Sequence, residues 1–198
     1  MFLWTAGYTV YMKVLVLVGS RDPKGRTARA TDALVAGLTA GGATVSRVRL
    51  LDRDIRMCVQ RGEDGFGDCL EKGVCKLEDG FAALVEELRA ADLAVFATPV
   101  YWGEMSEIMR AFLDRLRRIG LNDEGKKGIA GKPAFALCVA GGGGGGSFHS
   151  ADVMNRVLGH CDMDILDVLP ARKQNFDLKL EVLEITGRWL AGRPVGSG

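Results

Sequence analysis

Five short stretches of the chain carry the apolar, often β-branched residues that are typical of strands. The first and clearest is a continuous apolar run ended by Gly19 and Ser20, which favours a strand covered on both faces of a sheet. The five predicted strands are Met12–Val18, Thr44–Leu50, Leu93–Thr98, Pro133–Ala140 and Met163–Leu169.

The segments between these strands repeat their apolar residues at helical spacing. Leu34 and Leu38 mark one such face, and Gly41 and Gly42 stop that helix. Asp79 is a candidate N-cap for the helix that carries Leu84 and Leu88. The other predicted helices carry Ile108–Leu116, cover about 150–160, and run from Phe176 to Ala191, whereas 51–78 is predicted as a long irregular connection.

The regular alternation of strands and helices predicts an α/β fold. Five strands separated by helices give a parallel, doubly wound sheet in a flavodoxin-like three-layer sandwich, with strand order 2-1-3-4-5. Neither a repeat nor a linker divides the chain, so we expect residues 12–198 to form a single domain preceded by an extension, 1–11. Ligands of such sheets bind beyond the carboxyl ends of the strands, which directs attention to three loops.

The first loop, Gly19–Thr27, joins a strand to a helix N-terminus, where unpaired N–H groups and the helix dipole favour a phosphate. Ser20 and Thr27 add hydroxyls, and Arg21, Lys24 and Arg26 add positive charge. The glycine spacing and Arg26 break the Walker A pattern, and the dinucleotide fingerprint is absent. A polar surface turn without a ligand is the alternative.

The second loop, Thr98–Ser106, places Tyr101 and Trp102 at the carboxyl end of a predicted strand. Pro99 fixes one backbone angle, and Gly103 permits a close approach of the backbone. These side chains and the backbone amides are suited to wall a planar apolar ring. The alternative is that both aromatics belong to the core or to an interface.

The third loop is the run of six glycines Gly141–Gly146, which directly follows a predicted strand. Because these residues carry no side chains, a flat ligand can lie on the backbone itself. His149 is either a further hydrogen-bonding group there or a solvated residue near a helix start. Together the three loops predict a site with a phosphate end and a flat-ring end, which is the shape of FMN.

Composition adds little beyond these patterns. The 198 residues are 47% hydrophobic and 26% charged, as in ordinary soluble globular proteins, and the formal net charge is +1. No basic run indicates nucleic acid, and no apolar run is long enough to cross a bilayer. Five scattered cysteines without a secretory signal favour a cytoplasmic location with reduced thiols.

Three segments of the sequence resemble the NAD(P)H-dependent FMN reductase family of flavodoxin-like proteins. They are VLVLVGSRDPKGRTARATDAL, ADLAVFATPVYWGEMSEIMRAFLDRL and CVAGGGGGGS. The resemblance implies FMN as cofactor and NAD(P)H as co-substrate, with the first loop on the phosphate and the other two on the isoalloxazine. Asp22 is expected to turn away from the phosphate. The cofactor-binding residues are predicted to be Ser20, Arg21, Arg26, Thr27, Thr98, Pro99, Val100, Tyr101, Trp102, Gly103, Gly141, Gly142, Gly143 and Gly144.

The cysteines of the irregular segment resemble an incomplete iron–sulfur motif. In the iron–sulfur flavoprotein branch of the family, three closely spaced cysteines are followed by a fourth, and CLEKGVC (Cys69–Cys75) matches the end of that pattern. Cys58 is a candidate for its start, but Arg61 stands in place of the second cysteine. A [4Fe–4S] cluster normally takes four thiolates, so we predict no metal and keep a redox-active pair of Cys69 and Cys75 as an alternative.

The resemblance implies an enzyme that takes a hydride from NAD(P)H and reduces flavin, a quinone or another small acceptor. We predict no catalytic side chain, because the flavin supplies the chemistry. A flavodoxin-type electron carrier and a non-catalytic flavin-binding protein are the alternatives. The last helix is apolar on more than one face, and with the resemblance this predicts a homodimer or homotetramer.

Overall fold

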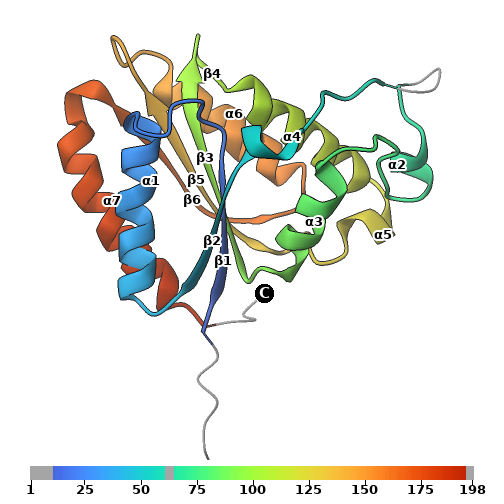
Figure 1. Ribbon diagram of the computed structural model, residues 1–198, viewed down its shortest axis with the longest axis horizontal. Coiled ribbons are helices and arrows are strands. Elements are labelled where there is room, and N and C mark those ends of the chain that lie inside the picture. The colour runs from blue at the N-terminus through green and yellow to red at the C-terminus, as the bar shows by residue number, and fades with distance from the viewer. Residues whose placement is uncertain (1–10, 61–64, 195–198) are drawn as a thin grey trace, which may run out of the picture.

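The computed structural model describes residues 11–60 and 65–194. The predicted N-terminal extension therefore lies outside the described residues except for Tyr11. The described chain forms a central sheet with helices on both faces (Figure 1).

The sheet confirms the predicted topology. Its parallel strands lie in the order β2-β1-β3-β5-β6, which is the predicted order once the short β4 is set aside. β4 pairs antiparallel with the end of β3 and was not expected. The strands are β1 Lys13–Val18, β2 Thr44–Arg49, β3 Leu93–Tyr101, β4 Glu104–Met105, β5 Pro133–Ala140 and β6 Asp164–Arg172.

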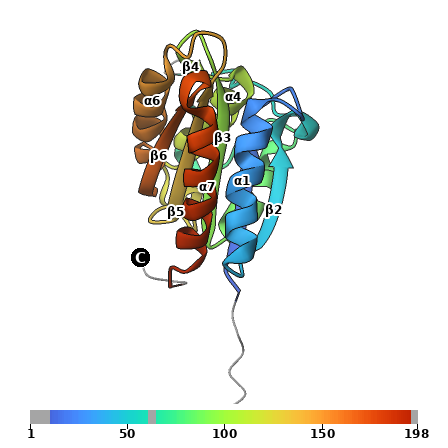
Figure 2. The ribbon, with the colours of Figure 1, turned by 90° about the vertical axis from the view of Figure 1, so that its left-hand side faces the viewer.

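The helices divide between the two faces of the sheet. α1 (Arg26–Ala40) and α7 (Phe176–Ala191) lie side by side on one face (Figure 2). α3 (Phe81–Ala90), α4 (Glu107–Ile119) and α6 (Ser147–Gly159) cover the other face. The remaining helical segments are short: η1 Leu50–Arg53, α2 Asp68–Glu71, α5 Asp123–Lys126 and η2 Lys173–Asn175.

The first strand shows why the apolar runs are continuous. Val14, Val16 and Val18 belong to the core under α1 and α7, whereas Leu15 and Leu17 belong to the core under α3, α4 and α6. Successive side chains of a strand point to opposite faces, and both faces are covered here. Every residue from Val14 to Val18 is accordingly buried.

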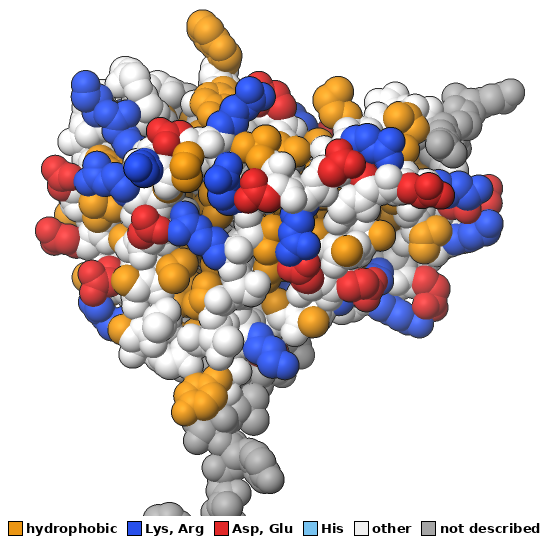
Figure 3. Space-filling view, viewed as in Figure 1, with side chains coloured by type: hydrophobic (Ala, Val, Ile, Leu, Met, Phe, Trp, Pro, Cys, Tyr) orange, Lys and Arg blue, Asp and Glu red, His pale blue; other side chains and the backbone are white. Residues whose placement is uncertain are grey.

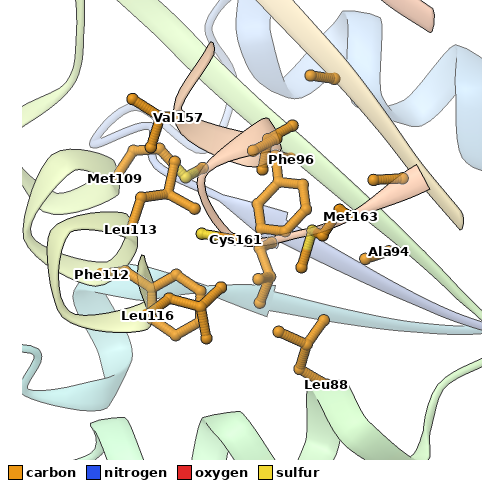
Figure 4. Packing of buried hydrophobic residues seen from close by; sticks show 14 of the residues in the cluster. Leu88, Ala94, Phe96, Met109, Phe112, Leu113, Leu116, Val157, Cys161 and Met163 are labelled. Carbon is orange, nitrogen blue, oxygen red and sulfur yellow. The ribbon is translucent and has the colours of Figure 1, made fainter. Parts of the chain in front are cut away.

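Aromatic and sulfur-containing side chains fill the core on the α4 and α6 side. Figure 4 shows Phe96 of β3 among Met109, Leu113 and Cys161. The rings of Phe112 and Phe81 lie 5.5 Å apart and join α4 to α3. This packing fixes the start of α4, which lies at the end of the sheet where the predicted loops meet.

Several boundaries differ from those expected. β3 continues through Pro99 to Tyr101, whereas its last pair with β1 is at Ala97. Pro99 therefore has a strand neighbour only on the β5 side, where its missing N–H group is tolerated. α6 begins at Ser147 rather than near 150. α3 begins at Phe81, and although the Asp79 carboxylate accepts the Phe81 N–H at 3.1 Å, Asp79 precedes the N-cap position.

The surface carries charges of both signs. On the face seen in Figure 3, Lys and Arg side chains are interspersed with Asp and Glu, in keeping with the net charge of +1. Among the described residues, no helix has the length and apolarity needed to cross a membrane.

Candidate functional site

The three predicted loops line one cleft of about 1010 Å³ at the carboxyl end of the parallel strands. β4 marks this end of the sheet in Figure 1. A cleft of this volume is at the upper end of the range for small-molecule sites. Its lining is Ser20, Asp22, Lys24, Gly25, Arg26, Thr27, Arg29, Pro99, Val100, Tyr101, Trp102, Glu107, Val139, Ala140, Gly141, Gly142, Gly143 and Gly145.

The loop after β1 presents an uncapped helix N-terminus to this cleft. α1 begins at Arg26, and neither a capping side chain nor an acidic residue occupies its first turn. The first N–H groups of a helix have no partner within the helix and carry the positive end of its dipole. Ser20 and Thr27 are both buried beside them. This end of the cleft is built to hold an anion.

Asp22 also lines the cleft, where it was expected to turn away from the phosphate, and its side chain is tied to its own turn. The side-chain Oδ1 accepts the backbone N–H of Lys24 at 2.9 Å, and the Asp22 carbonyl accepts the Ser20 hydroxyl at 3.2 Å. The carboxylate thus shapes the loop while Lys24, Arg26 and Arg29 supply positive charge to the cleft.

The loop after β3 is a tight β-hairpin. Tyr101 pairs with Glu104, and the two turn residues between them, Trp102 and Gly103, have φ angles of 53° and 89°. Two positive φ angles define a type I′ turn, which suits a hairpin but is uncommon for tryptophan. Trp102 is fully exposed at its tip. The hairpin therefore presents an aromatic side chain to solvent at the mouth of the cleft.

Buried hydroxyls hold the base of this hairpin. Thr98 Oγ1 accepts the Ser106 N–H at 2.9 Å, and Ser106 Oγ in turn accepts the Met109 N–H and caps α4. Both side chains are fully buried. Thr98 thus fixes the distance between the end of β3 and the start of α4 without reaching the cleft.

The glycine run contacts both other loops. A Cβ atom on Gly141 would lie 3.6 Å from Arg26 Nη1, so the guanidinium lies against the start of the run. A Cβ atom on Gly146 would lie 2.5 Å from the Gly103 Cα, which leaves no room for a side chain between run and hairpin. His149 Nε2 also lies 3.4 Å from Glu104 Oε1. The three loops therefore meet, as expected.

Most of the predicted cofactor-binding residues line the cleft, and four do not. Arg21, Thr98, Gly103 and Gly144 do not line the cleft, whereas the other predicted residues do. Sequence reasoning missed Arg29, although helical spacing places it one turn after Arg26. It also missed Glu107, because nothing in the sequence indicates how the first turn of α4 is oriented.

The cysteine loop does not form a four-thiolate site. Cys58, Cys69 and Cys75 line a separate cavity of about 160 Å³ in the segment between β2 and α3. Among the described residues, no three His, Cys, Asp or Glu side chains are arranged to hold a metal ion. Since a [4Fe–4S] cluster takes four thiolates, these residues do not fit one.

Comparison with known proteins identifies the family. Residues 12–171 match the NADPH-dependent FMN reductase family. An iron–sulfur flavoprotein of Archaeoglobus fulgidus is 29% identical over 147 residues, which are 74% of this chain and 62% of that protein. An FMN-dependent NADH:quinone oxidoreductase of Pseudomonas aeruginosa is 33% identical over 99 residues, 46% of each chain.

Solved structures share the fold. An NAD(P)H:quinone oxidoreductase from Methanothermobacter marburgensis superposes with a TM-score of 0.68 at 21% identity, covering 93% of this chain and 98% of that one. An archaeal flavodoxin superposes with a TM-score of 0.56 at 14% identity, covering 92% of this chain and all of that one. These likenesses confirm the flavodoxin-like fold.

The cleft and the family agree on the cofactor. One end offers an uncapped helix N-terminus that suits an anion, and the other offers aromatic side chains and bare backbone, which fits the phosphate and the ring system of FMN. The family match confirms FMN as the expected cofactor. The chain spans about three-fifths of the length of the iron–sulfur flavoproteins that it matches. By the extent of its match, this chain belongs to the NADPH-dependent FMN reductase family.

Proposed function

We propose that this protein is an FMN-dependent oxidoreductase that takes a hydride from NADPH or NADH and reduces flavin, a quinone or another small acceptor. The observation that carries the proposal is the single cleft in which an uncapped helix N-terminus faces an aromatic hairpin and a glycine run. FMN, when bound, supplies the redox chemistry, which is to accept a hydride and to pass electrons on. Relatives named as quinone oxidoreductases support a quinone as the acceptor.

The phosphate end is assigned to the loop after β1. The free N–H groups of the first turn of α1 donate to the phosphate, and the buried hydroxyls of Ser20 and Thr27 lie beside them. Arg26 extends from α1 to the start of the glycine run. Its guanidinium lies between the two loops, where it neutralises negative charge of the phosphate. These groups orient the cofactor by its anionic end.

The ring end is assigned to the hairpin and the glycine run. Val100 and Tyr101 provide an apolar wall, and Gly141–Gly143 bring backbone without side chains to the ring. Since the run carries no side chains, a planar group can approach the backbone closely. The opposite side of the ring stays accessible to a second planar molecule, such as a nicotinamide or a quinone. No side chain needs to transfer a proton, so we assign none as catalytic.

The visible spectrum of the purified protein tests this function. With FMN bound, NADPH or NADH added without oxygen is expected to bleach the flavin band, and a quinone added afterwards to restore it. Protein that binds FMN but cannot be reduced by either nucleotide would support the non-catalytic alternative. Protein that does not bind FMN at all would contradict both the site and the function.

The outer face of α7 supports a homodimer or homotetramer. Leu178, Ile185 and Trp189 are 61%, 60% and 52% exposed, and the half-buried Val182 completes a stripe with successive spacings of four, three and four residues. This is the spacing at which two helices pack along a seam. Light scattering on the purified protein measures the mass of the assembly.

A cytoplasmic location is the further part of the proposal. Five cysteines, all unpaired in this structure, are in keeping with a reducing compartment. Cell fractionation with an antibody against the chain tests this location.

A further inference from the structure

The five cysteines divide into two classes by their surroundings. Cys138 and Cys161 are fully buried, and burial raises the pKa of Cys138 to about 11 and the pKa of Cys161 to about 12. Cys58, Cys69 and Cys75 are only partly buried and line the cavity of about 160 Å³ between β2 and α3. Thiol chemistry in this protein is therefore confined to one loop, which the flavin site does not use.

Within this loop, the backbone brings Cys69 and Cys75 to the same place. After α2 the chain turns back, and the Val74 N–H donates to the Asp68 carbonyl at 3.3 Å. The Lys76 ammonium lies 3.0 Å from Asp68 Oδ1 and holds the same turn. Cys69 and Cys75 are the neighbours of the two hydrogen-bonded residues, and both pack against the core under α3 and α4. The turn therefore brings Cys69 and Cys75 to the wall of the same small cavity.

A buried arginine distinguishes Cys75 from the other thiols. Arg115 of α4 is 1% exposed, and its Nη2 donates to the Cys75 Sγ at 3.3 Å. The guanidinium is fixed by two hydrogen bonds to the Asp79 carboxylate, at 2.6 and 2.9 Å, and lies 4.1 Å above the Phe81 ring. This hydrogen bond holds the Cys75 sulfur in a fixed position beside a positive charge.

The charge on Arg115 is secure although the side chain is buried. Burial alone would lower the pKa of the guanidinium, but its hydrogen bonds to Asp79 and Cys75 outweigh burial and raise that pKa. The arginine therefore stays charged at every pH at which a thiol reacts. It is a positioning residue that acts through Cys75.

We propose that Cys75 and Cys69 form a dithiol that hydrogen peroxide oxidises to an intramolecular disulfide. The Cys75 thiolate attacks one peroxide oxygen, so that an S–O bond forms, the O–O bond breaks and hydroxide leaves. The Cys69 thiolate then attacks the Cys75 sulfenic sulfur, so that the S–S bond forms and the S–O bond breaks. The leaving oxygen takes a proton and departs as water. Two thiols and one peroxide thus give one disulfide and two waters.

Peptide mapping of the full-length FMN-loaded protein tests this pairing. The protein is reduced with dithiothreitol, freed of it, exposed to hydrogen peroxide, and digested without reductant. The expected product is a peptide pair that joins Cys69 to Cys75 and that dithiothreitol separates. A dominant link through Cys58, or unmodified Cys69 and Cys75, would show that the proposal is wrong.

Serine variants assign the two roles. Cys69→Ser is expected to stop at a Cys75 sulfenic acid that dimedone traps, whereas Cys75→Ser should consume peroxide about tenfold more slowly. Cys58→Ser is the matched control and should form the same disulfide as the unaltered protein. Equal dimedone labelling of Cys69 in Cys75→Ser would contradict the assignment of Cys75 as the attacking thiol.

Arg115→Met tests the positioning role through a ratio measured within one molecule. The rate of alkylation of Cys75 by iodoacetamide, divided by the rate for Cys58, should fall by about tenfold. Unfolding would instead expose all sites, and labelling of the buried Cys138 and Cys161 would reveal it. An unchanged ratio in folded protein would overturn the role of Arg115. These outcomes do not depend on flavin reduction by NADPH, so the dithiol and the oxidoreductase function can fail separately.

Discussion

Arg26 is the side chain that joins two of the three loops of the cleft, because its guanidinium lies against Gly141 while its backbone opens α1. Replacing it with methionine keeps most of the apolar stem and removes the charge. A hydrogen bond to a charged group contributes about 1.5–3 kcal/mol, so Arg26→Met is expected to weaken FMN binding by about tenfold to a hundredfold.

A titration of the protein with FMN, followed by flavin fluorescence at fixed salt, measures this loss. Arg21→Met is the matched control, since Arg21 belongs to the same loop but does not line the cleft. It should bind FMN with nearly unchanged affinity. Equal losses in the two variants would mean that Arg26 acts only through the general positive potential of the loop.

Asp79 and Arg115 are a buried ion pair on which stability depends. Removing one partner of such a pair costs about 3–5 kcal/mol, because the other charge is left uncompensated. Burial alone would raise the pKa of Asp79, but hydrogen bonds from Arg115 and from the backbone of Arg56 and Phe81 outweigh burial and hold that pKa below its ordinary value. The stabilisation is therefore complete above the unfolded-state value of about 3.9 and is lost as pH falls toward the lower native value.

Urea unfolding at several pH values measures this dependence. Asp79→Asn should be less stable than the unaltered protein at neutral pH and should lose less stability on acidification. Asp32→Asn is the control, because its ion pair with Arg47 is largely exposed and should be worth no more than about 1 kcal/mol. An acid response of Asp79→Asn as steep as that of the unaltered protein would assign the effect to other carboxylates.

At the scale of elements, the hairpin after β3 could not be predicted from the sequence. Pro99 is disfavoured within strands, and the Trp102-Gly103 turn lacks the Asn-Gly or Asp-Gly pair that identifies hairpins. The role of Thr98 depends on Ser106, which only the hairpin brings within hydrogen-bonding distance. The position of the glycine run at the cleft could be predicted, because an unbroken apolar strand precedes it.

The contact between the hairpin and the glycine run gives a prediction for Gly146. A Cβ atom there would lie 2.5 Å from the Gly103 Cα, and Gly146 has a φ of 77°, so Gly146→Ala must separate the two loops. We expect a loss of stability of about 1–3 kcal/mol and weaker FMN binding. Thermal unfolding and FMN titration measure the two effects.

Gly145→Ala is the matched control for this contact. A Cβ atom on Gly145 meets no atom within 4 Å, and its φ is not positive. Its stability should stay close to that of the unaltered protein. If Gly145→Ala is as damaging as Gly146→Ala, then flexibility of the run, and not its contact with Gly103, is what the site requires.

For the whole molecule, the order of strands and the end of the sheet that binds ligands could be predicted because both follow from general rules. Alternating strands and helices allow few topologies, and the loops at the carboxyl ends must then converge. The supporting contacts between those loops could not be predicted, because each joins residues that the fold alone brings together, such as Arg26 with Gly141.

The exposed stripe of α7 predicts which substitution would break the proposed homo-oligomer. Ile185 lies at its centre and is 60% exposed, while Leu183 and Leu190 on the inner face pack against the core. Ile185→Asp places a carboxylate in this seam and should reduce the mass measured by light scattering to that of one chain, with FMN binding intact. Phe148→Asp is the control, because Phe148 is also an exposed apolar residue but lies outside α7, and this variant should keep the mass of the unaltered protein. If the unaltered protein is itself a monomer, the α7 face has no role in assembly.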